Sequence, residues 1–307
     1  MEAGNHIQYL SHKEIDKTKW DACIEQASNG LIYPYSFYLD AMAKQWDALV
    51  LNDYEAIMPL TWNRKYGFYY LYQPAFTASL GIFGNQVNEH LVSSFLDAIP
   101  LKFRLIEVSL NHQNNFPSVI NGYYPRSNYT LDLNKPYEEI FKTYRESHKR
   151  NMTKAMQLGG KLTREINVDE IIKLNEEQLK HIGGTKTQDY TNFKNLYIFL
   201  KSKDAAKTYA IMGSRNNILA SAIFFFSHNR AYYIMVGNHP DGKTIGASHA
   251  LIDAFIKDHA GQDLILDFEG SDIRNLAFFY SSFGAKEEIY PALKINKLPF
   301  YIKWLKK

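Results

Sequence analysis

The hydrophobic and polar positions of the chain recur at two periods, which predict two kinds of element. Apolar residues at every third or fourth position predict helices, and short alternating or continuous apolar runs predict strands. Helices are expected over residues 12–26, 35–44, 86–98, 136–158, 168–181, 189–201, 245–259 and 273–282. Strands are expected over residues 6–10, 47–51, 55–62, 68–71, 103–108, 123–133, 161–166, 206–212, 218–227, 230–236, 264–268 and 289–294. This mixture predicts an α/β (mixed α+β) fold and excludes a helical bundle or a β-sandwich.

The order of these elements repeats. Each half gives helices, then antiparallel strands, a loop, a helix, a strand and a last strand, although residue identity between the halves is weak. Such a pattern indicates a duplicated architecture. With a boundary near Asn134-Lys135-Pro136, we expect one domain over residues 1–134 and another over residues 135–307. Each should be a mostly antiparallel, twisted sheet flanked by helices.

Composition narrows the class of protein. A chain of 307 residues fits one large domain or two smaller ones. Hydrophobic residues make up 46% and charged residues 22%, as in folded soluble proteins, which excludes disordered and collagen-like chains. The net charge of +3 is too small to indicate a nucleic-acid or membrane partner by itself, although local clusters of charge can still matter, and no DNA partner is expected. The aromatic content of 15% is the unusual feature.

No targeting or metal-binding pattern is visible. The first ten residues lack the basic and apolar regions of a signal peptide. The uncharged stretch 66–88 contains polar and turn-forming residues that do not suit a membrane span. Cys23 is the only cysteine, so neither a disulfide framework nor a thiol metal cluster is expected. We therefore expect a cytoplasmic protein with no transmembrane segment and no metal.

A glycine-containing loop leads from the strand at 230–236 into the next helix. Gly242 and Gly246 allow the chain to approach a ligand closely, and the amides of a helix start can bind phosphate. The same glycines would serve an ordinary turn between a strand and a helix. Neither the dinucleotide fingerprint nor the P-loop spacing is present, so a nucleotidase of that type is disfavoured.

The strand at 264–268 leads into two carboxylates. Because side chains alternate along a strand, Asp267 and Glu269 are expected on the same face. Two neighbouring carboxylates hinder each other's ionisation, which suits a general base. Strand-end solvation and helix capping are the alternative explanation of these acids.

Three segments after residue 240 resemble the C-terminal part of the FemAB-like branch of the GNAT acyltransferases. They are IGASHALID (245–253), LDFEGS (266–271) and FGA (283–285), and YRESHKRNMTKA (144–155) is similar to the branch's central helix. The resemblance implies tandem GNAT domains and the transfer of an acyl or aminoacyl group from a thioester or a tRNA ester to an amine. The usual pyrophosphate loop has Gln or Arg before its glycines, whereas this chain has Asn238 and His239.

The reaction implied by the resemblance gives each candidate residue a role. The transfer needs a base for the amine, donors for the oxyanion, and an acid for the leaving group. We assign the catalytic roles to Asp267, Glu269 and Tyr280. Asp267 or Glu269 would take the proton of the amine, and Tyr280, or alternatively Tyr232 or Tyr233, would protonate the leaving group. The residues assigned to the donor, for example acyl-CoA, are Asn238, Gly242, Lys243, Gly246, Ser248, Lys149 and Arg150.

Two of these donor residues belong to a basic cluster. The cluster comprises Arg145, Lys149, Arg150, Lys154, Lys161 and Arg164. An i, i+4 pair between Glu146 and Arg150 would account for part of this charge. A solvated helix face and a site for a phosphate-rich partner such as tRNA, a nucleotide-sugar peptide or coenzyme A both remain open. His148 lies on the apolar face of this helix and is interpreted as a packed core residue.

Two functions follow. The first is an N-acyltransferase that uses acyl-CoA or aminoacyl-tRNA and modifies a small-molecule amine acceptor, with a cell-wall precursor as one candidate. The second is a non-catalytic tandem-domain protein that binds a phosphate-bearing ligand or a protein partner.

Overall fold

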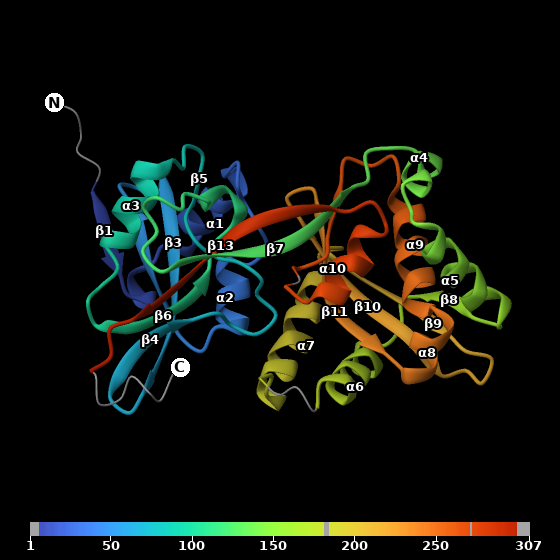
Figure 1. Ribbon diagram of the computed structural model, residues 1–307. Coiled ribbons are helices and arrows are strands. Elements are labelled where there is room, and N and C mark those ends of the chain that lie inside the picture. Colours follow the sequence, from blue (N-terminus) through green and yellow to red (C-terminus); the bar gives the residue numbers. More distant parts are fainter. Residues whose placement is uncertain (1–5, 181–183, 271, 300–307) are drawn as a thin grey trace. The chain divides into compact units, whose positions relative to one another are not determined.

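The computed structural model describes residues 6–180, 184–270 and 272–299 and shows a mixed α/β protein (Figure 1). The chain divides into two compact units, Met1–Arg126 with Ile289–Lys307, and Ser127–Glu288. We call them the first and the second unit. Strands β7 (Tyr123–Asp132) and β13 (Lys286–Asn296) each begin in one unit and end in the other. We expected a boundary near residue 134, with the C-terminal strand in the second domain. The two units instead divide the chain at residues 126 and 288, and residues 292–296 of β13 pair with β6 in the first unit.

The first unit is built on one sheet in which β1, β2, β3, β4, β6 and β13 are neighbours in that order. Its strands are β1 (Ile7–Leu10), β2 (Trp46–Leu51), β3 (Ala56–Lys65), β4 (Phe68–Tyr72), the short β5 (Phe83–Gly84) and β6 (Phe103–Ser109). The β4–β6 pair is parallel, whereas β1 with β2, β2 with β3, β3 with β4 and β6 with β13 are antiparallel. Its helices are η1 (His12–Glu14), α1 (Lys17–Gln26), α2 (Ser36–Met42), α3 (Glu89–Asp97) and η2 (His112–Asn114).

The second unit contains a sheet in the order β7, β12, β11, β10, β9 and β8. Its further strands are β8 (Lys161–Arg164), β9 (Ala206–Met212), β10 (Ile218–Ser227), β11 (Arg230–Asn238) and β12 (Ile265–Asp267). The β11–β12 pair is parallel, whereas β10 with β11, β9 with β10, β7 with β12 and β8 with β9 are antiparallel. Its helices are α4 (Tyr137–Lys142), α5 (Glu146–Gln157), α6 (Val168–Leu179), α7 (Thr187–Lys201), α8 (Pro240–Ile245), α9 (Ala247–His259) and α10 (Arg274–Ser281).

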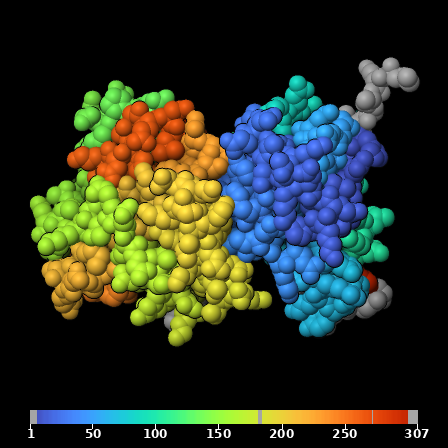
Figure 2. Space-filling view, turned by 180° about the vertical axis from the view of Figure 1, so that it is seen from behind, coloured from blue at the N-terminus to red at the C-terminus, as the bar shows by residue number. Residues whose placement is uncertain are grey.

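Consecutive phenylalanines on β10 show how helices cover both faces of this sheet. Phe224 stacks on Phe255 of α9 with ring centroids 3.8 Å apart, and Phe225 stacks on Phe193 of α7 at 5.3 Å. Because neighbouring side chains on a strand point to opposite faces, α9 and α7 cover opposite faces. Figure 2 shows α7 (yellow) at the surface of the second unit. Much of the aromatic excess is therefore core packing.

Two long helices expected from the sequence are interrupted. The helix expected over residues 136–158 is divided into α4 and α5, because Arg145 is extended and its N–H donates to the carbonyl of Ser282. The helix expected over residues 12–26 is divided by Asp16, whose side chain accepts the amides of Thr18 and Lys19 at the start of α1. In the described part of the chain, no helix combines the length and apolar character needed to cross a membrane.

Candidate functional site

Strands β11 and β12 diverge next to a bulge in β11, and we call this divergence the fork. In the β10–β11 register Ile223 faces Met235 and Phe224 faces Tyr233, so Ile234 is an extra residue on β11. On the other side, β12 ends at Asp267, opposite Tyr232, while β11 continues to Asn238. In the described residues, the edge of β11 beyond Tyr232 therefore has no strand beside it. Bulges of this kind reorient backbone groups and are common next to active sites.

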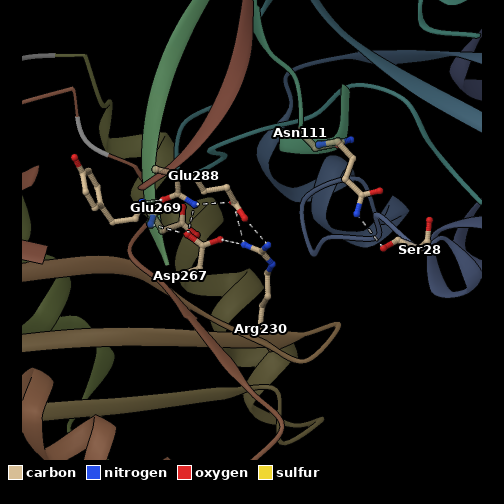
Figure 3. A network of polar contacts seen from close by, with 9 residues as sticks. Ser28, Asn111, Arg230, Asp267, Glu269 and Glu288 are labelled. Carbon is tan, nitrogen blue, oxygen red and sulfur yellow. Dashed lines mark hydrogen bonds and ion pairs between the residues drawn. The ribbon is translucent and has the colours of Figure 1, made fainter. Parts of the chain in front are cut away.

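Asp267, at the base of this fork, belongs to a buried ionic network (Figure 3). One oxygen accepts Nη1 of Arg230 at 2.7 Å, and the other accepts Nδ2 of Asn128 at 2.9 Å. Nη2 of Arg230 donates to Glu288 at 3.1 Å. Arg230 is only 8% exposed. Burial would lower its pKa, but the charges of Asp267 and Glu288 outweigh burial and raise that pKa above its usual value.

Glu269 does not share a strand face with Asp267, so the prediction from side-chain alternation was wrong. The strand ends at Asp267, and Glu269 has a left-handed backbone with φ of 65°. Its N–H donates to Oδ1 of Asp267 at 2.9 Å. A left-handed conformation is uncommon for a residue with a side chain and often marks a functional site. The buried carboxylate thus fixes the backbone that carries Glu269.

Tyr280 lies beside these acids on α10. Its ring stacks on Phe268 with centroids 4.5 Å apart and is 7% exposed. Burial, together with the charge of Glu269, raises the pKa of Tyr280 to about 12. The phenol therefore keeps its proton at neutral pH, as a proton donor to a leaving group must.

The two glycines of the loop after β11 have structural reasons to be glycine. A Cβ on Gly242 would lie 2.0 Å from the carbonyl oxygen of Leu219 on β10. Gly246 joins α8 to α9 with φ of 84°, and a Cβ there would lie 2.6 Å from the carbonyl oxygen of Asn151. Packing and turning thus explain both residues without reference to a ligand.

The other loop residues assigned to the donor lie around this turn. Ser248 donates from its hydroxyl to the side-chain oxygen of Asn238, which links the start of α9 to the end of β11. The N–H of Asn238 donates to Gln178 of α6 at 2.7 Å. Lys243 is exposed on α8. The amide side chain of Gln178 on α6 therefore borders the same fork.

Several members of the basic cluster have intramolecular partners. Glu146 pairs with Lys149 at 2.8 Å, so the expected Glu146–Arg150 pair is not the contact that forms. Arg164 forms two hydrogen bonds with Asp258, at 2.7 and 2.8 Å. Lys154 donates to the carbonyl of Thr244 at 3.1 Å. Arg150 stays exposed on α5, which makes it the better placed of the two assigned cluster residues for an external phosphate.

A pair of histidines joins α5 to α9. The rings of His148 and His249 lie 4.4 Å apart and are surrounded by Phe279 and Phe283. His148 is 4% exposed, and among the described residues no group meets the distance and angle of a hydrogen bond with either of its ring nitrogens. Burial and the neighbouring histidine lower the pKa of His249 to about 4. The pair fits the packed core histidine expected at residue 148.

Three asparagine side chains of the first unit form hydrogen bonds that hold the loop at Ile82 in place. The carbonyl of Ile82 accepts side-chain amides from Asn29 at 2.9 Å, Asn111 at 3.0 Å and Asn114 at 3.1 Å. Figure 3 includes Asn111 of this group. All three asparagines are buried, and their contacts explain them as structural.

Neither a metal centre nor a reactive thiol stands out. Among residues 6–180, 184–270 and 272–299, no three His, Cys, Asp or Glu residues are grouped as metal ligands. Burial raises the pKa of the Cys23 thiol to about 11, which disfavours the thiolate form that a nucleophile needs.

The sequence predicted roles for Asp267, Glu269 and Tyr280, and it gave no indication of three features around them. Arg230 and Glu288 were not assigned, because the contact of Arg230 with Asp267 spans 37 residues of chain and its contact with Glu288 spans 58. The bulge at Ile234 was also missed, because nothing in the apolar run of β11 distinguishes that residue.

No family model matches the chain, and neither does any curated protein sequence. Solved structures do match almost its full length. FemX has 12% identity and a TM-score of 0.65, with 96% of this chain and 98% of FemX covered. L-PGS from Bacillus licheniformis has 12% identity and a TM-score of 0.55, with 94% and 95% covered. A GNAT-family acetyltransferase from Colwellia psychrerythraea has 10% identity and a TM-score of 0.51, with 95% and 100% covered. The chain therefore has the fold of the FemAB-like GNAT acyltransferases.

Proposed function

We propose that the protein is an N-acyltransferase whose reaction takes place at the fork between β11 and β12. The observation that carries the proposal is the bulge at Ile234 opposite the end of β12, with Glu269 and Tyr280 at the same end of the sheet. The fold shared with FemX and the acetyltransferase supports the same chemistry. In this proposal each unit is one GNAT-like domain, and the second unit binds the donor.

The proposed reaction needs no covalent intermediate. Glu269 accepts a proton from the attacking amine, and the amine nitrogen bonds to the donor carbonyl carbon. Backbone groups at the Ile234 bulge hold the developing oxyanion. The bond to the leaving group then breaks, and Tyr280 supplies its proton. Asp267 acts by positioning, because its carboxylate is engaged by Arg230, Asn128 and the N–H of Glu269.

The donor is proposed to be an acyl thioester such as acyl-CoA, or an aminoacyl-tRNA. Its phosphates would approach the loop from Asn238 to Ser248, with Lys243 and Arg150 as exposed cations. Lys149 contributes less, because its ammonium already pairs with Glu146. Gly242 and Gly246 shape this loop rather than contact the donor.

The acceptor is proposed to be an amine that enters beside α6. A pocket of about 680 Å³ lies between α6 and α7, and its charged lining comprises Glu176 and Glu177 together with Lys173, Lys180 and Lys186. The carboxylates suit an ammonium group, and the lysines suit an anionic part of the same acceptor. The contact of Gln178 with Asn238 places α6 beside the fork. A small amine or the peptide amine of a cell-wall precursor would have this chemistry.

A donor panel tests the proposal. Acetyl-CoA, longer acyl-CoAs, UDP-sugar peptides and tRNA are added separately, and the unfolding temperature is measured. At 100 times its dissociation constant, a true ligand stabilises the protein by about 2.7 kcal/mol. The stabilising donor is then incubated with amine acceptors, and acylated product is measured by mass spectrometry. Stabilisation without turnover would favour the non-catalytic alternative, and no stabilisation by any compound would contradict both functions.

A further inference from the structure

Lys207 of β9 makes a contact that sets it apart from other lysines of the second unit. Its side chain is exposed, and its Nζ lies 3.0 Å from Nε2 of His259, at the C-terminal end of α9. The same ammonium lies 5.1 Å from the ring centre of Phe226. The ammonium group of Lys207 thus contacts a phenyl ring and an imidazole, and the side chain is otherwise open to solvent.

The tautomer of His259 follows from its second contact. Nδ1 lies 2.8 Å from the carbonyl oxygen of Phe255. A carbonyl only accepts hydrogen bonds, so Nδ1 carries a hydrogen and Nε2 presents a lone pair to Lys207. The imidazole is 2% exposed and stacks on Phe255 with centroids 4.2 Å apart. Burial, as the largest effect, lowers the pKa of His259, so the ring is neutral at pH 7.

Three other lysines of the second unit have acidic partners. Lys149 pairs with Glu146, Lys194 with Asp169, and Lys201 with Glu165. Within the described part of the chain, no carboxylate lies at ion-pair distance from Lys207. Asp258, which precedes His259, is instead occupied by Arg164 and by the hydroxyl of Tyr209. The hydrogen-bond partner of Lys207 is therefore an imidazole lone pair rather than a carboxylate.

We propose that Lys207 is a site of Nε-acylation by small activated acyl donors, with His259 as its base. Lys207 first releases one proton to solvent and reacts as the free amine. Its nitrogen bonds to the acyl carbon, and the proton that becomes acidic on that nitrogen moves to Nε2 of His259. The bond from the acyl carbon to the leaving group, a phosphate or a thiolate, breaks, and the leaving group takes the proton from the imidazolium. An amide is formed, His259 returns to its neutral state, and no oxidant or reductant is needed.

Acetyl phosphate tests this site without relying on the proposed transferase reaction, because it reacts with lysines in free solution. The full chain is incubated with acetyl phosphate, digested at intervals, and the acetylated peptides are quantified by mass spectrometry. Lys203 is the internal reference, since it is exposed and lies just before β9. The initial rate at Lys207 should exceed that at Lys203 by at least roughly 10-fold, below the usual contribution of a positioned base. Equal rates in the unmodified protein would overturn the proposal.

His259→Gln isolates the role of the base. Glutamine can accept a hydrogen bond but cannot take a proton at neutral pH. The rate at Lys207 should therefore fall to the rate at Lys203, while Lys203 itself is unchanged. A His259→Gln protein with the same far-ultraviolet circular dichroism as the parent and an undiminished Lys207 rate would contradict the assignment. Because His259 is buried, the comparison of the two lysines in the unmodified protein remains decisive if the variant does not fold.

Discussion

The N–H of Glu269 donates to Oδ1 of Asp267 at 2.9 Å, so the last residue of β12 fixes the conformation of the acid two positions later. Asp267 is itself held by Arg230 and Asn128. The two carboxylates are therefore not equivalent. Asp267 is buried and engaged on both oxygens, whereas Glu269 is partly exposed and its charge influences Tyr280. Under the proposed function, Asp267 positions Glu269, and Glu269 accepts the proton of the amine.

Glu269→Gln should abolish most turnover while leaving the fold intact. Loss of a positioned general base should lower kcat by roughly 100-fold or more. The free energy of unfolding should change by only about 0.5 kcal/mol, because Glu269 is partly exposed. Initial rates with the stabilising donor and urea unfolding check the two expectations. Glu139→Gln, at an exposed position of α4, is the control, and an unchanged rate in Glu269→Gln would remove Glu269 from the mechanism.

Arg230→Met should destabilise the second unit strongly. It would leave Asp267 and Glu288 as neighbouring acids without their shared guanidinium, at a cost of about 3–5 kcal/mol. Urea unfolding measures this cost. Arg164→Met is the matched control, because its pair with Asp258 is half exposed and should contribute only about 1 kcal/mol or less. Equal losses in the two variants would show that the buried network does not stabilise the fold.

Local patterns were sufficient to predict most elements of the second unit. The strands expected over residues 206–212 and 218–227 are β9 and β10 with the same bounds, because alternating and β-branched runs bounded by polar turns encode them locally. Helix interruptions were not predictable in this way. The break before α5 depends on a bond from Arg145 to the carbonyl of Ser282, which only the folded chain brings together.

The candidate site shows the same limit. The acids at residues 267 and 269 stand out in the sequence, since they follow an apolar run. Their different surroundings come from Arg230, from Asn128 and from the left-handed backbone at Glu269, which no spacing rule reveals. The pairing of β13 with β6 joins residues 292–296 to residues 105–109, and the periodicity of neither segment identifies its partner.

The histidine pair predicts a loss of stability in mild acid. The folded-state pKa of His249 is about 4, against about 6.5 in an unfolded chain. Between these values the unfolded chain binds the proton and the folded chain does not, so the free energy of unfolding falls as pH falls from about 7 to 4. His249 should contribute on the order of 2 kcal/mol to this fall. Urea unfolding across this range should give a flatter profile for His249→Leu, and an unchanged slope would contradict the prediction.

Gly242→Ala should destabilise the junction between α8 and β10. The new methyl group would lie 2.0 Å from the carbonyl oxygen of Leu219, and the backbone of a central strand cannot move aside as a flexible side chain can. Overpacking of this kind costs about 1–3 kcal/mol or more. Gly67→Asn is the control, because no atom lies within 4 Å of a Cβ at Gly67 and asparagine tolerates its left-handed φ. Thermal unfolding of both variants should show a clear loss only for Gly242→Ala.

Substitutions of Arg150 and Arg164 should distinguish a phosphate-binding cation from a structural one. The salt dependence of donor binding should identify the donor class. Arg150 is exposed, whereas Arg164 is bound by Asp258. If the donor is aminoacyl-tRNA, log Kd should depend steeply on log salt concentration, and Arg150→Ala should reduce that slope by about 1. Arg164→Ala should leave the slope unchanged. An acyl-CoA donor should give a shallow slope in all three proteins, because it carries few phosphates. Filter binding for tRNA and calorimetry for acyl-CoA supply the constants, and equal effects of both substitutions would exclude Arg150 from the donor site.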